Sequence, residues 1–211
     1  MTTLLPFFPL NLVVYPQEAL NLHVFEPRYK QLISDCLQEE KTFGIPAYLD
    51  EQVSEYGTEV RILSVEKRYD DGRMDIRTEG VRVFLLQSLD NPMADKLYAG
   101  GEVRFMPDHT DEDPNVRAAL LFNVEQLYSL LNLRPEFRTT PDRLLSYEIA
   151  HKIGLSLHQE YELLKFRSET ERQTYLSEHL KRTLPVVSEI ERTKARIRMN
   201  GHFRHLDPLN F

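Results

Sequence analysis

Histidine is the residue type that most directly suggests chemistry in this sequence, because a neutral imidazole binds metal ions. Among the seven histidines, His151 lies near His158, and His202 lies near His205 with Asp207 as the nearest carboxylate. A zinc site needs about three or four ligands at compatible spacing, and neither group supplies such a set. We therefore expect no bound metal and no cofactor, and we interpret these histidines as solvated residues near helix ends.

Residues for nucleophilic or acid-base catalysis are not arranged convincingly either. Ser64 and Lys67 could form a Ser-Lys pair, but both lie on a predicted strand whose side chains alternate between two faces. Cys36 falls on the apolar face of a predicted helix, with no neighbour that would lower the pKa of its thiol. The adjacent carboxylates of Asp70-Asp71 coincide with a turn, where acidic residues are common. We expect no catalytic residue, and hence a protein that is not an enzyme.

The most distinctive charged motif is the run Glu26-Pro27-Arg28-Tyr29. One interpretation is structural: Glu26 or Arg28 pins the start of a helix to neighbouring strands, and Tyr29 enters the core. The other is functional, and it predicts a groove for an extended peptide. The residues that would border this groove are Tyr15, Glu26, Arg28 and Lys30. An exposed Phe7 or Phe8 would favour the groove, because unfolded proteins are recognised through apolar contacts.

A basic cluster near the C-terminus allows another kind of partner. Its members are Lys181, Arg182, Arg192, Lys194, Arg196 and Arg198, with Glu189 and Glu191 between them. Cations near a helix C-terminus complement the helix dipole, so a solvated face is the simpler interpretation. Docking of an acidic partner or RNA is the alternative.

Composition limits the remaining classes of function. A chain of 211 residues with 41% hydrophobic residues can bury a core, and its net charge of −7 argues against a nucleic-acid partner. Cys36 is the only cysteine, so no intramolecular disulfide can form. The sequence carries neither a signal-peptide pattern nor an apolar stretch of about 20 residues. We expect a cytoplasmic protein with no membrane segment.

The first half of the chain, residues 1–106, has the short apolar runs and Pro, Gly and Asp punctuation of strands and turns. Val60 to Tyr69 and Met74 to Thr78 predict a hairpin closed at Asp70-Asp71-Gly72, and Glu79-Gly80 predicts the next corner. A single helix interrupts these strands. Its apolar face carries Tyr29, Leu32, Ile33, Cys36 and Leu37, and Pro27 suits its first turn.

The second half is predicted to be helical. Residues 107–114 form an acidic linker, and residues 115–211 a bundle whose first helix begins at Asp113-Pro114. Thr140-Pro141 predicts a helix start upstream of Leu145, with Gly154 at the end of that helix. The pairs Ser156 with Gln159, and Ser168 with Glu171, have capping-box spacing. Pro185 predicts a kink or break near Leu184 in the last helix, and Asn200-Gly201 its end.

Several of these runs, in this order, resemble the N-terminal domain of Lon proteases, often called the Lon substrate-binding domain. The opening run Leu5-Pro6-Phe7-Phe8-Pro9-Leu10 and the helix start Phe25-Glu26-Pro27-Arg28-Tyr29 are similar to its first strand and helix. Gly57-Thr58 with Val60 and Ile62 resembles a later strand, and the segment from Leu145 to Ile153 resembles its helical part. The likeness covers nearly the whole chain.

The resemblance implies an α+β protein, in which a PUA-like β-barrel domain with one embedded helix is followed by a C-terminal helical bundle. It also implies a non-catalytic module that binds unfolded proteins or peptides, acts as an adaptor in proteolysis or protein quality control, and has a protease as a possible partner. The ATPase and Ser-Lys protease modules of full-length Lon are missing from this sequence, and none of its eight glycines forms a phosphate-binding loop. The alternative is an RNA-binding module built on the same fold.

Overall fold

The computed structural model describes residues 2–134, 137 and 143–202 of the chain. The strands are β1 (Thr3–Phe7), β2 (Ala19–Val24), β3 (Phe43–Leu49), β4 (Gln52–Arg68), β5 (Met74–Leu86) and β6 (Ala99–Phe105). The helices are α1 (Pro27–Glu39), α2 (Pro114–Leu130), α3 (Leu145–Ile149), the 3-10 helix η1 (Ala150–Lys152), α4 (Leu157–Lys165) and α5 (Glu169–His202). The predicted α+β class, with strands first and helices last, is confirmed. Within the described ranges, no helix is both long and apolar enough to cross a membrane.

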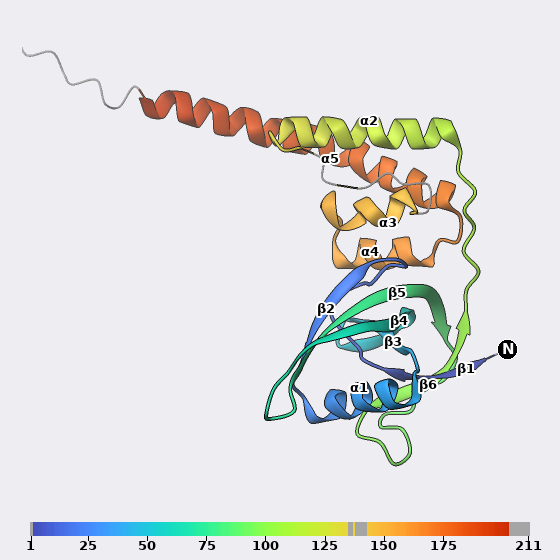
Figure 1. Cartoon of the computed structure of the whole chain (residues 1–211). Helices are drawn as coiled ribbons and strands as arrows, with labels where there is room; N and C mark the ends of the chain where they lie inside the picture. The colour runs from blue at the N-terminus through green and yellow to red at the C-terminus, as the bar shows by residue number, and fades with distance from the viewer. Residues whose placement is uncertain (1, 135–136, 138–142, 203–211) are drawn as a thin grey trace, which may run out of the picture.

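The strands form one sheet in the order β2-β5-β4-β3-β1-β6, and a further pairing between β5 and β6 closes five of them into a ring. We call this ring the barrel. All pairings are antiparallel except that of β1 with β3. β2 lies outside the ring, paired with β5 alone. Figure 1 shows the barrel and α1 at one end of the molecule, α3 and α4 next to it, and α2 beside α5 at the far end.

The hairpin between β4 and β5 forms as predicted. Its turn includes Gly72 at a φ of 80°, a conformation that glycine adopts without steric cost. The predicted corner at Glu79-Gly80 is wrong, because β5 continues through both residues. Its pairing with β4 instead shifts by one residue, since Glu59 pairs with Arg82 and Val60 with Gly80. The glycine is needed for close packing: a Cβ at position 80 would lie 2.1 Å from the carbonyl oxygen of Tyr15.

The embedded helix α1 also forms as predicted, with Pro27 in its first turn. Its buried residues are Tyr29, Leu32, Ile33 and Cys36, which join strand residues such as Phe8 and Phe43 in one core cluster. Full burial of an aliphatic or aromatic side chain stabilises a fold by about 1.5–3 kcal/mol. The four-residue stripe therefore accounts for the attachment of α1 to the barrel.

Capping residues determine where two of the later helices begin. Asp113 accepts a hydrogen bond from the Asn115 amide at the start of α2. The capping box of Ser156 and Gln159 forms in full at the start of α4. Ser168 caps α5 by accepting from the Glu171 amide, but its hydroxyl donates to Asp111, a residue of the acidic segment.

Two predictions for the helical half need correction, and two fall partly outside the described residues. The helix at Leu145 is short and passes into the 3-10 helix η1, although Gly154 follows it with a φ of 79° as expected. α5 runs through Pro185, so a break near Leu184 is wrong, while a kink there stays a prediction. The start signal Thr140-Pro141 lies outside the described residues, as do His205 and Asp207 of the tail. α5 is described to His202, one residue beyond the predicted end at Asn200-Gly201.

The barrel and the helices share a core. One cluster joins Val13, Tyr15 and Val83 of the barrel half to residues of the helices, including Leu120 and Leu163. The acidic segment between the halves is held in place by backbone pairing, since the His109 amide donates to Arg167 and His109 accepts from Glu169. The division into residues 1–106, 107–114 and 115–211 stays a prediction.

Arg172 of α5 ties the acidic segment to the helices from inside the core. Its side chain is fully buried, and its guanidinium donates to Asp108 at 2.8 Å and to Glu169 at 3.1 Å. Its Nε also donates to the Ser146 hydroxyl at 3.0 Å. A buried charge is stable only where partners compensate for its lost hydration. This network therefore holds together the acidic segment at Asp108, α3 at Ser146 and the first turn of α5.

Candidate functional site

Glu26 and Arg28, two of the predicted site residues, lie together at the start of α1. The Arg28 Nε donates to the Glu26 carboxylate at 2.9 Å, and its guanidinium lies 4.5 Å from the centre of the Tyr29 ring. Both charged side chains are partly exposed. Burial raises the pKa of the Tyr29 hydroxyl, although the Arg28 charge acts in the opposite direction. The pair therefore lies at the surface at the N-terminus of the helix, while Tyr29 enters the core as the structural interpretation predicts.

Lys30 and Tyr15 are placed elsewhere. The Lys30 ammonium donates to the Asp71 carbonyl at 2.8 Å, which attaches the β4–β5 turn to α1. Tyr15 is fully buried on the opposite side of the barrel, where its ring lies 5.0 Å from the Tyr147 ring and its hydroxyl donates to the Glu160 carbonyl at 3.0 Å. Burial raises the pKa of the Tyr15 hydroxyl. Tyr15 is therefore a core residue, and of the other three predicted residues only Arg28 lines the groove described below.

The structure lacks the exposed Phe7 or Phe8 that would have favoured the peptide groove. Phe7 stacks on Phe84 inside the barrel, and Phe8 stacks on Tyr29 at 3.8 Å between ring centres. Both are core residues, with 0% and 5% of their surface exposed. Both can be buried because Phe7, the last residue of β1, points into the barrel, while the next residue, Phe8, packs against α1.

Arg28 does border a groove, and we call it the Arg28 groove. It has a volume of about 340 Å³. It is lined by Pro9, Arg28, Tyr29, Tyr48, Val53, Asn91 and Ala99. Its walls are polar and apolar in about equal measure, and Tyr48 is 38% exposed. Ligand sites typically combine apolar walls with a few polar groups, and the polar groups here include the Arg28 guanidinium and the Asn91 amide.

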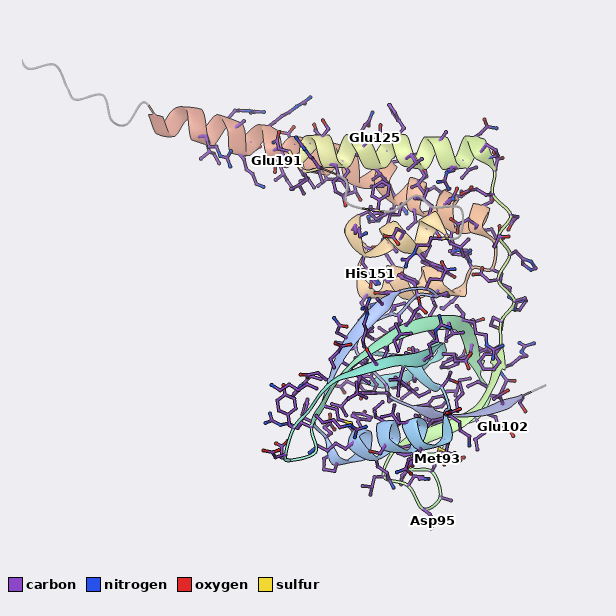
Figure 2. The ribbon with its side chains drawn as sticks, in the orientation of Figure 1. Met93, Asp95, Glu102, Glu125, His151 and Glu191 are labelled. Carbon is purple, nitrogen blue, oxygen red and sulfur yellow. The ribbon has the colours of Figure 1, made fainter. Side chains whose placement is uncertain are left out.

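The loop that brings Asn91 to the groove is anchored on α1. Asp35 accepts hydrogen bonds from Lys96 at 2.6 Å and from Tyr98 at 2.7 Å, and the Gln31 side chain accepts from the Leu97 amide at 2.8 Å. Burial acts to raise the pKa of the Asp35 carboxyl, but these donors outweigh it and the pKa is lowered. Figure 2 shows this loop, with Met93 and Asp95 labelled, next to α1. The anchored loop gives the groove one fixed wall.

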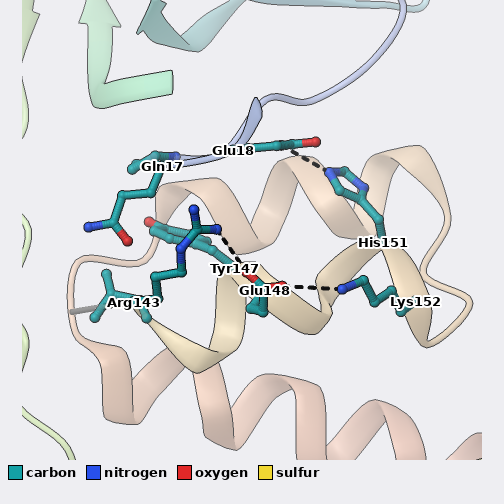
Figure 3. A pocket seen from close by; sticks show the side chains of 9 residues that line it. Gln17, Glu18, Arg143, Tyr147, Glu148, His151 and Lys152 are labelled. Carbon is teal, nitrogen blue, oxygen red and sulfur yellow. Dashed lines mark hydrogen bonds and ion pairs between the residues drawn. The ribbon is translucent and has the colours of Figure 1, made fainter. Parts of the chain in front are cut away.

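A second hollow, missed from the sequence, lies where the barrel meets the helices (Figure 3), and we call it the junction pocket. Its volume is about 140 Å³. Glu18 enters it from the segment before β2, and Arg143, Glu148, His151 and Lys152 enter it from the region of α3 and η1. Glu148 pairs with Arg143 at 3.2 Å and with Lys152 at 3.3 Å.

His151 joins the two halves of the molecule across this pocket, at the place labelled in Figure 2. Its Nδ1 lies 2.7 Å from Glu160 of α4, and its Nε2 lies 3.3 Å from Glu18. Burial acts to lower the pKa of His151, but the two carboxylates outweigh it and raise the pKa to about 9. His151 is therefore a cation at neutral pH and is poorly suited to act as a general base. No spacing pattern links Glu18 to His151, 133 residues away, so one sequence alone could not reveal the pair.

Among the described residues, the candidates for catalysis either lie apart from one another or are buried. Lys67 lies over the Tyr69 ring at 4.4 Å, while the Ser64 hydroxyl donates to Glu66, so the two do not form a pair. Cys36 is buried, and burial raises the pKa of its thiol to about 12. In the part of the chain that the structure describes, no cluster of three or more His, Cys, Asp or Glu side chains could hold a metal ion.

Comparisons with known proteins identify the family. The sequence model of the ATP-dependent protease La (LON) substrate-binding domain matches residues 4–182. The solved Lon N-terminal domain protein from Xanthomonas campestris is 30% identical, with a TM-score of 0.64 over 81% of this chain and 94% of that chain. The comparison with curated proteins found no match.

A more distant structure shows the same fold. The N-terminal domain of the Mycobacterium avium complex Lon protease is 17% identical, with a TM-score of 0.63 over 85% of this chain and 98% of that chain. The family match spans both the strands and the helices described above, including the Glu26–Arg28 pair and the junction pocket. The chain belongs to the LON substrate-binding domain family.

Proposed function

We propose that this protein is a non-catalytic module that binds unfolded proteins or peptides through the Arg28 groove. The observation that carries the proposal is an accessible groove at the start of α1, lined by Arg28 and Tyr29 of the run Phe25-Glu26-Pro27-Arg28-Tyr29 and by apolar residues such as Val53. Unfolded polypeptides expose apolar side chains that native proteins bury, and the apolar part of the groove would contact them.

The groove's polar groups would orient such a ligand. Arg28 stands at the rim with Glu26 as its ion-pair partner, so it offers N–H donors to peptide carbonyl groups without a large uncompensated charge. The rings of Tyr29 and Tyr48 supply flat apolar area at low entropic cost. Binding by these groups needs no covalent chemistry, in keeping with the buried thiol of Cys36 and the protonated His151.

We further propose that the protein acts in the cytoplasm as an adaptor that presents bound clients to a protease, or that holds them during quality control. A single cysteine, buried and unable to form an internal disulfide, suits a reducing compartment. The printed description of the family, a substrate-binding domain of an ATP-dependent protease, supports the link to proteolysis.

Binding of an unfolded protein to groove variants tests the proposal. The probe is fluorescein-labelled α-lactalbumin, reduced and carboxymethylated so that it stays unfolded, and the readout is fluorescence anisotropy. Arg28→Ala and Val53→Asp should each weaken binding about fivefold or more, the loss of about 1 kcal/mol expected where a residue is one of the few that dominate an interface. Arg117→Ala is the matched control, because Arg117 also pairs with a nearby carboxylate but lies on α2.

If all three variants lose affinity equally, or if none of them loses affinity, a specific role for the groove is contradicted. RNA is the alternative ligand, and the exposed basic cluster of α5 would be its site. Saturable binding of RNA by the wild-type protein, with no binding of the unfolded protein, would replace the proposed function with that alternative.

A further inference from the structure

β2 presents an open sheet edge. It pairs with β5 on one side, from Ala19 opposite Glu79 to Val24 opposite Met74, without a register shift. Throughout the described residues, no strand pairs with its other side, and no backbone hydrogen bond joins that side to another element. The edge is six residues long.

The hydrogen-bond pattern shows which backbone groups face outward. In an antiparallel pair, residues alternate between those bonded to the partner strand and those bonded away from it. The Gly80 amide donates to the Glu18 carbonyl, and the Thr78 hydroxyl donates to the Leu20 carbonyl, so the even-numbered residues of β2 face β5. The N–H and C=O groups of Ala19, Asn21 and His23 therefore point to the open side, and all three residues are exposed.

Natural proteins usually protect such an edge with lysine, proline, a bulge or a covering segment. The sequence of β2, Ala-Leu-Asn-Leu-His-Val, contains neither lysine nor proline, and its pairing with β5 contains no bulge. Among the described residues, none forms a backbone hydrogen bond with this outer edge. The backbone N–H and C=O groups of an unprotected edge can form hydrogen bonds with the backbone of another extended chain.

Three aromatic rings lie together at the end of the edge. The His23 ring stacks near Phe25 at 6.0 Å and meets the Tyr69 ring edge-on at 5.9 Å. Asp75 holds His23 in place and accepts from the Tyr69 hydroxyl at 2.8 Å. Phe25 is 58% exposed, and core packing gives no reason for this. The cluster provides apolar contact for side chains of a chain lying along β2.

We propose that an extended segment of an unfolded polypeptide adds to the open edge of β2 as a further strand, with its side chains against Phe25 and the neighbouring rings. This inference rests on the proposed function, because it takes unfolded polypeptide as the ligand. Backbone pairing depends little on sequence, and it would let one domain bind many clients. In the sequence, the edge ends at Val24, immediately before Phe25 and the Glu26–Arg28 pair.

Proline at the centre of the edge tests this pairing. Asn21→Pro removes an outward N–H that the added strand needs, but it leaves the bonds from β2 to β5 intact, because the Asn21 amide faces away from β5. Asn21→Ala is the matched control, since it removes the same side chain and keeps the N–H. The probe is a fluorescein-labelled peptide that alternates Val or Phe with Thr and ends in Lys, measured by fluorescence anisotropy.

We expect Asn21→Pro to weaken binding about tenfold or more, because it removes one backbone hydrogen bond and places the proline ring where the added strand must approach. Asn21→Ala should stay within about twofold of wild type, as expected for a surface substitution. A second measurement leaves the protein unchanged and so does not depend on the folding of the proline variant. The peptide is N-methylated at alternate residues in the two possible sets, and one set should abolish binding while the other retains it.

The outcomes separate the inference from the function on which it rests. If the wild-type protein binds the peptide, but Asn21→Pro and both methylated peptides bind equally well, the edge is not used and the proposed function stands. If the wild-type protein binds neither the peptide nor carboxymethylated α-lactalbumin, both proposals fall.

Discussion

Glu18 and His151 face each other across the boundary between the barrel and the helices, with 3.3 Å between the carboxylate oxygen and Nε2. Glu160 of α4 approaches the other ring nitrogen, and the Tyr15 ring lies 4.8 Å from the imidazole. One protonated histidine therefore holds a segment of the barrel half against two segments of the helical half. The attachment of the two halves should depend on its charge.

We expect the stability gained from His151 to fall as the pH rises. The pKa of His151 in the folded protein is raised from 6.5 to about 9. A folded-state pKa above the unfolded one stabilises the protein fully below the unfolded value, and this stabilisation is lost as the pH passes through the folded value. The stability difference between wild type and His151→Gln should be largest near pH 6 and should shrink through pH 9. Urea unfolding at several pH values measures it, and a difference independent of pH would contradict the prediction.

Replacing Arg172 should be among the most damaging single changes in the helical half. Arg172→Met leaves the carboxylate of Glu169, which is 1% exposed, without its buried partner. Breaking a buried ion pair by removing one partner costs about 3–5 kcal/mol of unfolding free energy. Arg117→Met removes a partly exposed arginine and should cost about 0.2–1 kcal/mol. Urea unfolding compares them, and similar losses would show that the buried network contributes little.

Gly80→Ala tests the close approach of β5 to the segment before β2. The added Cβ would meet the Tyr15 carbonyl oxygen at 2.1 Å, and backbone must move to relieve the overlap. We expect a loss of about 1–3 kcal/mol, the usual cost of overpacking. Gly154→Ala is the comparison, because its Cβ meets no atom within 4 Å but the φ of 79° costs about 1–2 kcal/mol.

A double variant shows which part of Tyr15 causes the Gly80→Ala penalty. Tyr15→Phe changes the side chain but leaves the backbone carbonyl in place, and thermal unfolding measures the penalty with and without it. The Gly80→Ala penalty should persist in that background. Its disappearance would mean that the Tyr15 side chain, rather than the carbonyl, sets the requirement for glycine.

Cys36 should be unreactive in the native protein. Its thiol is buried, and its pKa is raised to about 12, so almost no thiolate is present near pH 8. Ellman's reagent should label it slowly in buffer and rapidly in denaturant. Fast labelling of the folded protein would show that α1 opens frequently or that the thiol is more exposed than the structure indicates.

The sequence predicts features that depend on a few neighbouring residues. Pro27 starts α1, Gly72 closes the hairpin, and Ser156 with Gln159 caps α4, because each acts within about one turn of the backbone. The position of Cys36 in the core followed from helix periodicity alone.

Features that depend on distant segments could not be predicted in the same way. Gly80 looked like a corner, but it is a point of close approach to Tyr15, 65 positions earlier in the chain. Tyr15 looked like a groove residue, but Tyr147 and Glu160 cover it. Pro185 should disfavour a continuous helix, yet α5 continues through it, and α2 packs alongside α5.

The most direct test of the central claim, that this domain binds unfolded polypeptide without cleaving it, is an anisotropy titration. Fluorescein-labelled α-lactalbumin is compared in its native and its reduced, carboxymethylated forms, and the products are examined by gel electrophoresis. We predict saturable binding of the unfolded form alone, with the probe recovered intact. Equal binding of both forms, binding of neither, or cleavage of the unfolded form would contradict the account.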